Sequence, residues 1–253
     1  MQGRTGIHVF LATPDALLQA RGADAAMRLL DASDGAHVAR FRFQKDRDIA
    51  LASRALQRIA IAHAARLAEG AAAGLRFSDE AGARPFLLQP PALRNLHFSA
   101  ANTRGMVACA VSSANLVGMD VEEVKPELAP ELVEHCCTPA EKRELSRLPP
   151  DRQRLEFFRL WTLKESYLKA RGIGLQLSPH LIGFDASATA GVFRLHAAPS
   201  VEPNPGHWHF QVLDAGSGHA ASVCARDQTG IRPTITVLGV AWSGSGFELS
   251  SPP

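Results

Sequence analysis

The chain has 253 residues, of which 46% are hydrophobic and 21% are charged, and its formal net charge is +2. These are ordinary values for a globular protein, and they exclude collagen-like, coiled-coil and wholly disordered chains. A net charge this small gives no argument for nucleic-acid binding. The charge is uneven, however, because residues 139–171 hold nine Lys or Arg against five Asp or Glu. This segment therefore either faces an anionic ligand or partner, or is a solvated helix face.

Segments that would send the chain to a membrane are missing from the sequence. No run of about 18 or more apolar residues exists to span a bilayer. The first apolar stretch is broken by His8, Pro14 and Asp15, which is not typical of a signal peptide. The four cysteines include an adjacent pair and show no CxxC spacing. We therefore expect a cytoplasmic protein with reduced thiols.

The first half of the chain predicts one long helix among short strands. Residues 7–12 form the first expected strand. The helix is expected over residues 46–69, where Leu51, Ala55 and Ile59 recur at helical spacing and Gly70 ends the pattern. Further strands are expected at residues 96–98, 106–112 and 116–121, the last two joined as a hairpin.

The second half predicts two helices followed by strands. Thr138 and Glu141 have the spacing of a capping box that starts a helix. A longer helix is expected over residues 151–171, between a Pro-Pro break and Gly172. Strand-like runs follow, separated by Gly and Pro, at residues 191–196, 207–213, 219–225 and 234–242.

Both halves thus read as a strand, a long helix and further strands, which predicts an α+β fold of two similar halves. We expect an N-terminal half over residues 1–115 and a C-terminal half over residues 116–242. Residues 243–253 are rich in Ser, Gly and Pro and are expected to form a flexible tail.

Two acids on one expected strand form the first candidate site. Asp120 and Glu122 are two residues apart, so their side chains point to the same face of the strand. Neighbouring carboxylates repel each other unless a cation or a proton relieves them. Mg²⁺, which prefers oxygen ligands, would do so. An exposed strand face with solvated acids is the alternative.

The long second helix carries the other candidate residues. Trp161, Glu165 and Lys169 are spaced i, i+4 and i+8 and share one face. A surface ion pair between Glu165 and Lys169 is the simple interpretation. An acid on the same stripe as a tryptophan is costly unless it is used. A third carboxylate brought to Asp120 and Glu122 would complete a metal site.

The two motifs together resemble a known family. Gly118, Asp120 and Glu122 form G-x-D-x-E, and about forty residues later Trp161 opens W-x-x-K-E-S-x-x-K. This order is similar to that of the 4′-phosphopantetheinyl transferases of the large class that activates peptide and polyketide synthetases. Weaker similarities to that family cover most of the chain, at residues 40–47, 82–85 and 95–111.

The resemblance implies a fold, a reaction and a set of roles. It implies a monomeric pseudo-dimer of two α+β halves, with coenzyme A in the cleft between them. The reaction would transfer the phosphopantetheine arm of coenzyme A to a serine of an acyl or peptidyl carrier protein. Mg²⁺ would be held by Asp120, Glu122 and Glu165. Glu165 would take the serine proton, and Lys169 and Lys164 would contact the phosphates. The basic helices would face an acidic carrier protein.

The chain departs from the family where the nucleotide end of coenzyme A is expected. His37 stands where some members have a basic residue, and Ala101-Asn102 replaces the usual Ser-His pair. Arg84 stands for the usual lysine of a G-K-P turn. The resemblance implies that His37, Arg84 and Asn102 meet the 3′-phosphate, and neutral groups at two of these positions predict a weaker grip.

Three alternatives remain at this point. A catalytically silent homologue that binds coenzyme A or a carrier protein is favoured by these departures. A metal-dependent phosphodiesterase or nuclease would use the same acids, but the His-rich ligand sets of such enzymes are missing from the sequence. A purely structural domain leaves the aligned acids unexplained.

Overall fold

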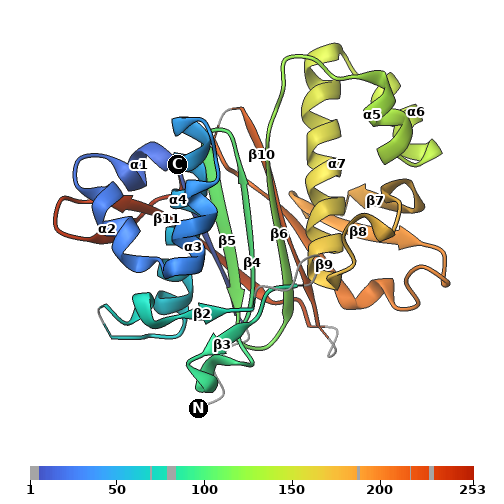
Figure 1. The fold of residues 1–253 in the computed structure, drawn as a ribbon. Coiled ribbons are helices and arrows are strands. Elements are labelled where there is room, and N and C mark those ends of the chain that lie inside the picture. Colours follow the sequence, from blue (N-terminus) through green and yellow to red (C-terminus); the bar gives the residue numbers. More distant parts are fainter. Residues whose placement is uncertain (1–5, 69, 79–83, 187–188, 217, 228–230) are drawn as a thin grey trace. The chain divides into compact units, whose positions relative to one another are not determined.

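The computed structural model describes residues 6–68, 70–78, 84–186, 189–216, 218–227 and 231–253 (Figure 1). It divides into two compact units. Unit 1 comprises residues 1–81, 85–115 and 234–253, and unit 2 comprises residues 82–84 and 116–233. No helix in the described part of the chain is long and apolar enough to cross a membrane.

Unit 1 is built on a five-stranded sheet with the order β12-β11-β1-β5-β4. The strands are β1 (Gly6–Ala12), β4 (His97–Thr103), β5 (Met106–Ser112), β11 (Thr234–Trp242) and β12 (Phe247–Ser250). The long helix α4 (Gln44–Ala64) packs on β5, β4 and β1. Their contact forms an apolar core that includes Phe10, Leu56, Ile61, Phe98 and Val111.

Smaller elements complete unit 1. They are α1 (Pro14–Leu18), α2 (Gly22–Leu29), α3 (Ala32–Ala39), η1 (Ala71–Gly74), β2 (Arg76–Phe77), β3 (Leu87–Gln89) and η2 (Pro91–Leu93). The three short helices α1, α2 and α3 were not predicted from the sequence, because each spans only five to eight residues. A helical period cannot be established reliably over so few residues.

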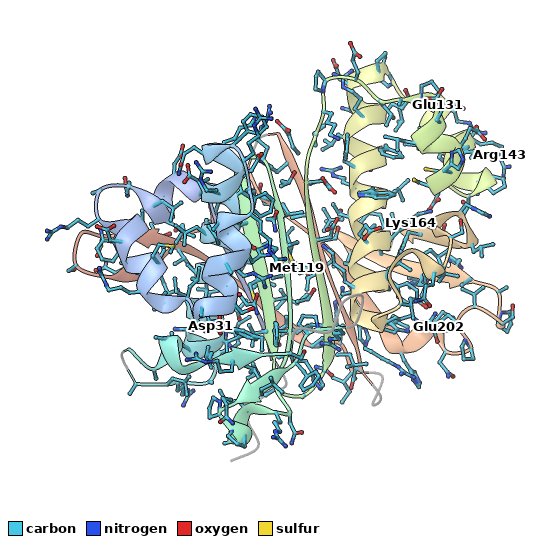
Figure 2. The ribbon with its side chains drawn as sticks, in the orientation of Figure 1. Asp31, Met119, Glu131, Arg143, Lys164 and Glu202 are labelled. Atoms are coloured by element: carbon cyan, nitrogen blue, oxygen red, sulfur yellow. The ribbon has the colours of Figure 1, made fainter. Side chains whose placement is uncertain are left out.

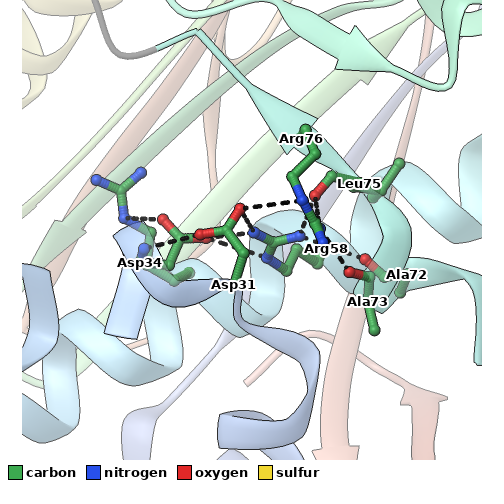
Figure 3. Close-up of polar contacts among 8 residues, drawn as sticks. Asp31, Asp34, Arg58, Ala72, Ala73, Leu75 and Arg76 are labelled. Atoms are coloured by element: carbon green, nitrogen blue, oxygen red, sulfur yellow. Dashed lines mark hydrogen bonds and ion pairs between the residues drawn. The ribbon is translucent and has the colours of Figure 1, made fainter. Parts of the chain in front are cut away.

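A buried arginine on α4 holds several of these elements together (Figure 3). Arg58 is fully buried, and its guanidinium contacts Asp34 at 2.5 Å and Asp31 at 3.0 Å. It also donates to the carbonyl of Leu75 at 2.7 Å. Asp34 lies within α3 and Asp31 caps its N-terminus. The charge of Arg58 is thus paired and hydrogen-bonded, as a buried charge must be, and it fixes α3 against α4.

Unit 2 is built on a second five-stranded sheet, with the order β6-β10-β9-β8-β7. The strands are β6 (Leu116–Glu123), β7 (Ile182–Ala186), β8 (Val192–Ala197), β9 (Trp208–Leu213) and β10 (His219–Arg226). The long helix α7 (Pro150–Arg171) packs on β6 and β10. The remaining elements are α5 (Pro130–Cys136), α6 (Pro139–Ser146), η3 (Gly174–Gln176), η4 (Pro179–Leu181) and η5 (Pro205–His207).

The two units share a topology, which confirms the prediction of two similar α+β halves. In each, the first strand is followed by a long helix, β1 by α4 and β6 by α7. In each, a later antiparallel pair returns so that its second strand lies beside the first strand. This gives the order β1-β5-β4 in unit 1 and β6-β10-β9 in unit 2.

The structure corrects two expectations about strand partners. Residues 106–112 and 116–121 were expected to form a hairpin, but β5 pairs with β1 and β4, whereas β6 pairs with β10. The turn between them is closed instead by Ser112, whose hydroxyl accepts hydrogen bonds from the N–H groups of Ala114 and Asn115. A short connection between two strands therefore does not by itself show that they pair with each other.

The C-terminal segment was also assigned to the wrong half. β11 was expected in the C-terminal half, but it pairs with β1 in parallel, Val9 lying opposite Val237. Residues 243–253 were expected to be a flexible tail, but they contain β12, which pairs with β11. Val240 and Phe247 pack into the core of unit 1, and this burial holds the segment there.

Candidate functional site

The site in unit 2 begins with the close approach of α7 to β6. A Cβ atom on Gly118 would lie 1.8 Å from the carbonyl oxygen of Ser166. Only glycine therefore allows the helix backbone to lie this close to the strand. Two residues further along β6, Asp120 is 4% exposed. The alternation of the strand puts Glu122 on the same face as Asp120.

Lys169 of α7 pairs with Asp120. Its ammonium nitrogen lies 2.6 Å from Asp120 Oδ1. The lysine side chain is about one-third exposed, whereas the aspartate side chain is buried. The other oxygen, Asp120 Oδ2, is buried and has no hydrogen-bond partner among the described residues. A buried carboxylate oxygen without a partner is a costly arrangement that a ligand or a cation would relieve.

The other two acids lie around this pair. Trp161 donates from its indole Nε1 to Glu122 Oε1 at 3.2 Å. Burial raises the pKa of Asp120 to about 7, Lys169 opposes the rise, and the charges of Glu122 and Glu165 add to it. Burial likewise raises the pKa of Glu165, again with Lys169 opposing and Glu122 adding. The three carboxylates therefore interact electrostatically, as the motif spacing predicted.

The predicted magnesium site is only partly matched. Among the residues that the structure describes, no three His, Cys, Asp or Glu side chains are arranged to hold a metal ion. The chemistry of the donor set does fit Mg²⁺, because all three groups are carboxylates and Asp120 Oδ2 lacks a partner. In this arrangement the positive charge beside Asp120 belongs to Lys169.

Lys164 corrects the prediction that it holds phosphate. It is 1% exposed, and its ammonium group lies 2.6 Å from Glu141 Oε2 on α6. Figure 2 labels Lys164 on α7. The same nitrogen donates to the carbonyls of Cys136, Ile182 and Pro179, at 2.7, 2.8 and 3.2 Å. These acceptors use the whole donor capacity of an ammonium group. Lys164 therefore joins α7 to α5, α6 and β7 and does not face a ligand.

Arg84 lies in unit 2, whereas Gly82 and Ala83 of the same predicted turn lie outside the described residues. Burial lowers the pKa of its guanidinium, and Cys224 opposes this shift. One long hydrogen bond, 3.4 Å to the carbonyl of Val117, is its recorded polar contact within the described part. A partly buried guanidinium with so few hydrogen-bond partners would be stabilised by a bound anion.

His37 and Asn102 lie in unit 1. Asn102 is exposed at the end of β4 and lines a cavity of about 310 Å³. The ring of His37 packs edge-on against Phe41, which also lines this cavity. Two basic residues of the same cavity, Lys45 and Arg104, were not among the predicted site residues. Both lie inside segments with family similarity, residues 40–47 and 95–111, so their positions were available as a signal.

Two family models match the chain in succession. A model of the 4′-phosphopantetheinyl transferase superfamily matches residues 116–224, and a model of the N-terminal part of a 4′-phosphopantetheinyl transferase matches residues 19–114. Both models describe one class of protein, and they meet at the junction between β5 and β6. The chain belongs to the 4′-phosphopantetheinyl transferase superfamily.

Individual relatives agree with this class. A 4′-phosphopantetheinyl transferase of Bacillus subtilis is 33% identical over 42% of this chain and 45% of its own length. The transferase Sfp of Bacillus subtilis strain 168 is 29% identical over 60% of this chain and 63% of its length. HetI of Nostoc is 33% identical over 40% of this chain and 43% of its length. The matches thus span about half the length of these relatives.

Solved structures give a weaker likeness. The holo-[acyl-carrier-protein] synthase of Thermotoga maritima is 22% identical, with a TM-score of 0.35, over 55% of this chain and 84% of its own. The assignment rests on the sequence matches and not on this likeness.

Proposed function

We propose that this protein transfers the 4′-phosphopantetheine arm of coenzyme A to a serine hydroxyl of an acyl or peptidyl carrier protein. The observation that carries the proposal is the group formed by Lys169 and three mutually interacting carboxylates in unit 2. Membership of the superfamily supports the same reaction. The cytoplasmic location that we propose with it rests on the sequence features described above, and the monomeric state rests on the resemblance.

The chain's own residues would perform the proton and charge steps. The serine oxygen attacks the β-phosphorus, the bond to the bridging oxygen breaks, and adenosine 3′,5′-bisphosphate leaves with that electron pair. Glu165 would take the serine proton, and its raised pKa makes it a stronger base than an ordinary glutamate. Lys169 would stabilise the charge that develops on the leaving phosphate.

Mg²⁺, which we propose is held by Asp120, Glu122 and Glu165, would supply charge neutralisation of the pyrophosphate when bound. The unpartnered Asp120 Oδ2 supports this role. Lys169 pairs with Asp120 Oδ1 in this structure. A cation bound beside Asp120 would replace this pair and would leave the ammonium group of Lys169 free to contact a phosphate.

The candidate cations for the phosphates of coenzyme A are proposed for each unit by itself. In unit 1, Lys45, Asn102 and Arg104 line one cavity, with His37 behind Phe41. In unit 2, the half-buried Arg84, with one long recorded hydrogen bond, is a separate candidate for phosphate. The weaker grip expected from His37 and Asn102 is offset in this proposal by Lys45 and Arg104.

Fewer cations are available to an acidic carrier protein than the nine of residues 139–171. Six of these cations pair with carboxylates, at Glu134, Glu141, Glu144, Asp151, Glu156 and Asp120. Arg143 and Arg152 are exposed, and the structure records no carboxylate partner for them in its described part. We propose that these two arginines meet the carrier protein.

Mass spectrometry of an apo carrier protein incubated with coenzyme A, Mg²⁺ and the protein tests the reaction. We expect the mass of phosphopantetheine to be added. Glu165→Gln and Lys169→Met should each lower turnover about a hundredfold, the scale of general acid–base and charge-stabilising groups. Glu156→Gln is the matched control, because this acid lies on the same helix and pairs with Arg159. Turnover of all variants within twofold of wild type would contradict the proposal.

A second candidate, a homologue that binds coenzyme A without transferring its arm, is favoured by the contact between Lys169 and Asp120 where a metal ligand is expected. The same incubation separates the two functions. A protein that only binds coenzyme A leaves the mass of the carrier protein unchanged but shows coenzyme A binding in isothermal titration calorimetry.

A further inference from the structure

Unit 1 contains a second cavity, of about 760 Å³, that the proposed transfer does not use. It lies at the C-terminal ends of α2 and α4, against η1 and the turn between β11 and β12. Its volume falls within the range of about 300–1,000 Å³ that is common for small-molecule sites. The cavity that contains Asn102 lies at the opposite end of α4, because Lys45 and His63 are about 27 Å apart along a helix that rises 1.5 Å per residue.

One part of the cavity wall is apolar and aromatic. Leu29, Ile59, Leu67, Trp242 and Phe247 line it. The rings of Trp242 and Phe247 pack edge to face with their centroids 5.1 Å apart, so this wall is held in place. The indole Nε1 of Trp242 is buried and has no hydrogen-bond partner within the described part of the chain. The wall therefore offers an apolar, aromatic surface to a ligand.

The other part of the wall is basic. Arg28, His63 and Arg66 line the cavity, and none of its described lining residues is acidic. Glu69 lies outside the described residues. The C-terminal ends of α2 and α4 each contribute about half a negative charge, which two full guanidinium charges exceed. The cavity therefore keeps a positive potential that is complementary to an anion.

The position of Arg66 is fixed by the backbone. Its φ of +53° is left-handed, which is uncommon for a residue other than glycine. The N–H of Arg66 donates to the carbonyl of His63, and that of Leu67 donates to the carbonyl of Ala62, at 3.0 and 2.9 Å. These bonds end α4 and hold the backbone of Arg66 at the edge of the cavity.

We infer that this cavity binds a small organic anion with an apolar body, in which a carboxylate or phosphate meets Arg28 and Arg66 and the body packs on Trp242 and Phe247. This inference is independent of the transfer reaction, because every lining residue differs from those assigned to it. Carboxylates and phosphates share the chemistry that the two guanidiniums recognise, so the test distinguishes them.

The probe for this site is 8-anilinonaphthalene-1-sulfonate, an aromatic anion whose fluorescence rises in apolar surroundings. We expect saturable binding at one site that weakens about fivefold in Arg28→Gln and in Arg66→Asn, the scale of a partly exposed ion pair. Asn tolerates the left-handed backbone at position 66. Arg147→Gln removes the same charge from an exposed site at the end of α6 in unit 2 and should bind the probe as wild type does.

Two further measurements complete the test. N-phenyl-1-naphthylamine, which lacks the sulfonate, should bind all four proteins equally. Decanoate and decyl phosphate should each displace the anionic probe, and the one with the lower inhibition constant identifies the preferred head group, whereas decanol should not displace it. Circular dichroism melts check that the variants remain folded.

Three results would overturn the inference. They are the absence of saturable probe binding, equal binding by wild type and both arginine variants, and displacement of the probe by coenzyme A but not by either decyl anion. The last result would place the probe in the coenzyme A site. Loss of transfer activity in the assay described above would leave the inference unaffected.

Discussion

Asp120 is a carboxylate in a costly environment, and this cost depends on pH. Burial raises its pKa to about 7, so between pH 4 and pH 7 the folded protein holds a proton that the unfolded chain has released. The native state then binds more protons than the unfolded state, and stability falls as pH rises through this window. Above pH 7 the loss is complete.

Asp120→Asn should remove this pH dependence. We expect the variant's free energy of unfolding, relative to wild type, to rise by nearly 3 kcal/mol between pH 5 and pH 8, since about two pH units of this range lie below the pKa and each is worth about 1.4 kcal/mol. Urea unfolding of the metal-free protein at both pH values measures it. Glu144→Gln, at an exposed acid on α6, is the control and should differ from wild type by the same amount at both. A constant gap between Asp120→Asn and wild type would contradict the burial argument.

Lys164 shows how a motif position can serve the fold instead of the ligand. Lys164→Met leaves Glu141 buried without its cation, and removing one partner of a buried pair typically costs about 3–5 kcal/mol. We expect a loss of this size in urea unfolding. Lys142→Met is the matched control, because its partner Glu134 is 68% exposed and loss of this pair should cost at most about 1 kcal/mol. Weaker coenzyme A binding with unchanged stability would instead return Lys164 to the ligand site.

The sequence indicated which site residues belong together but not which groups they contact. Alternation along β6 grouped Asp120 with Glu122, and the helical stripe on α7 grouped Trp161, Glu165 and Lys169. The contacts of Trp161 with Glu122 and of Lys169 with Asp120 come from the packing of α7 on β6. The partners of Lys164 lie on α5, α6 and β7, which no local pattern brings together. Its burial therefore depended on tertiary packing and was not predictable.

At the scale of elements, the contact between α7 and β6 determines the geometry of the site. Gly118→Ala would push a methyl group into the backbone of α7, 1.8 Å from Ser166 O and 2.8 Å from Ala170 N. Neither atom belongs to a flexible side chain, so helix and strand must separate. We expect a loss of about 3 kcal/mol in urea unfolding, as for severe overpacking, and loss of transfer because Lys169 moves away from Asp120.

A second glycine gives the control for this substitution. Nothing lies within 4 Å of a Cβ atom on Gly35, which is inside α3. Gly35→Ala should stabilise the protein by roughly 0.5–1 kcal/mol, since alanine loses less backbone entropy in a helix. Equal effects of the two substitutions would show that close packing at Gly118 is not what matters.

The elements themselves were predictable to different degrees. The periodicity of α4 and α7 runs over 21 and 22 residues, and both helices were placed within a few residues of their ends, apart from the C-terminus of α4, which was expected five residues later. The pairing of β11 with β1 joins residues more than 220 positions apart. Local composition contains no information on such a partner, so that strand was placed in the wrong half.

At the scale of the whole molecule, unit 1 is discontinuous in sequence, and its stability depends on the segment that follows unit 2. Deleting residues 234–253 removes β11 and β12 and exposes one edge of β1. It also removes Val240 and Phe247 from the core of unit 1. Hydrogen–deuterium exchange should then accelerate in β1, β5 and α4, while β6, β10 and α7 keep their protection. Uniform acceleration across both units, or none, would contradict the division into units.

The interrupted chain of unit 1 also affects its folding during translation. Ala12 and Thr234 are 222 positions apart, so at about 5–20 residues per second the ribosome needs roughly 10 to 45 seconds to deliver the partner of a strand made at the start. For that time β1 has one unpaired edge, which is a template for aggregation. Unit 2 is continuous from residue 116 to residue 233 and can complete its sheet meanwhile. β1 thus belongs to the sheet that is finished after the sheet of unit 2, and a nascent chain stalled before residue 234 would depend on chaperones to protect that edge.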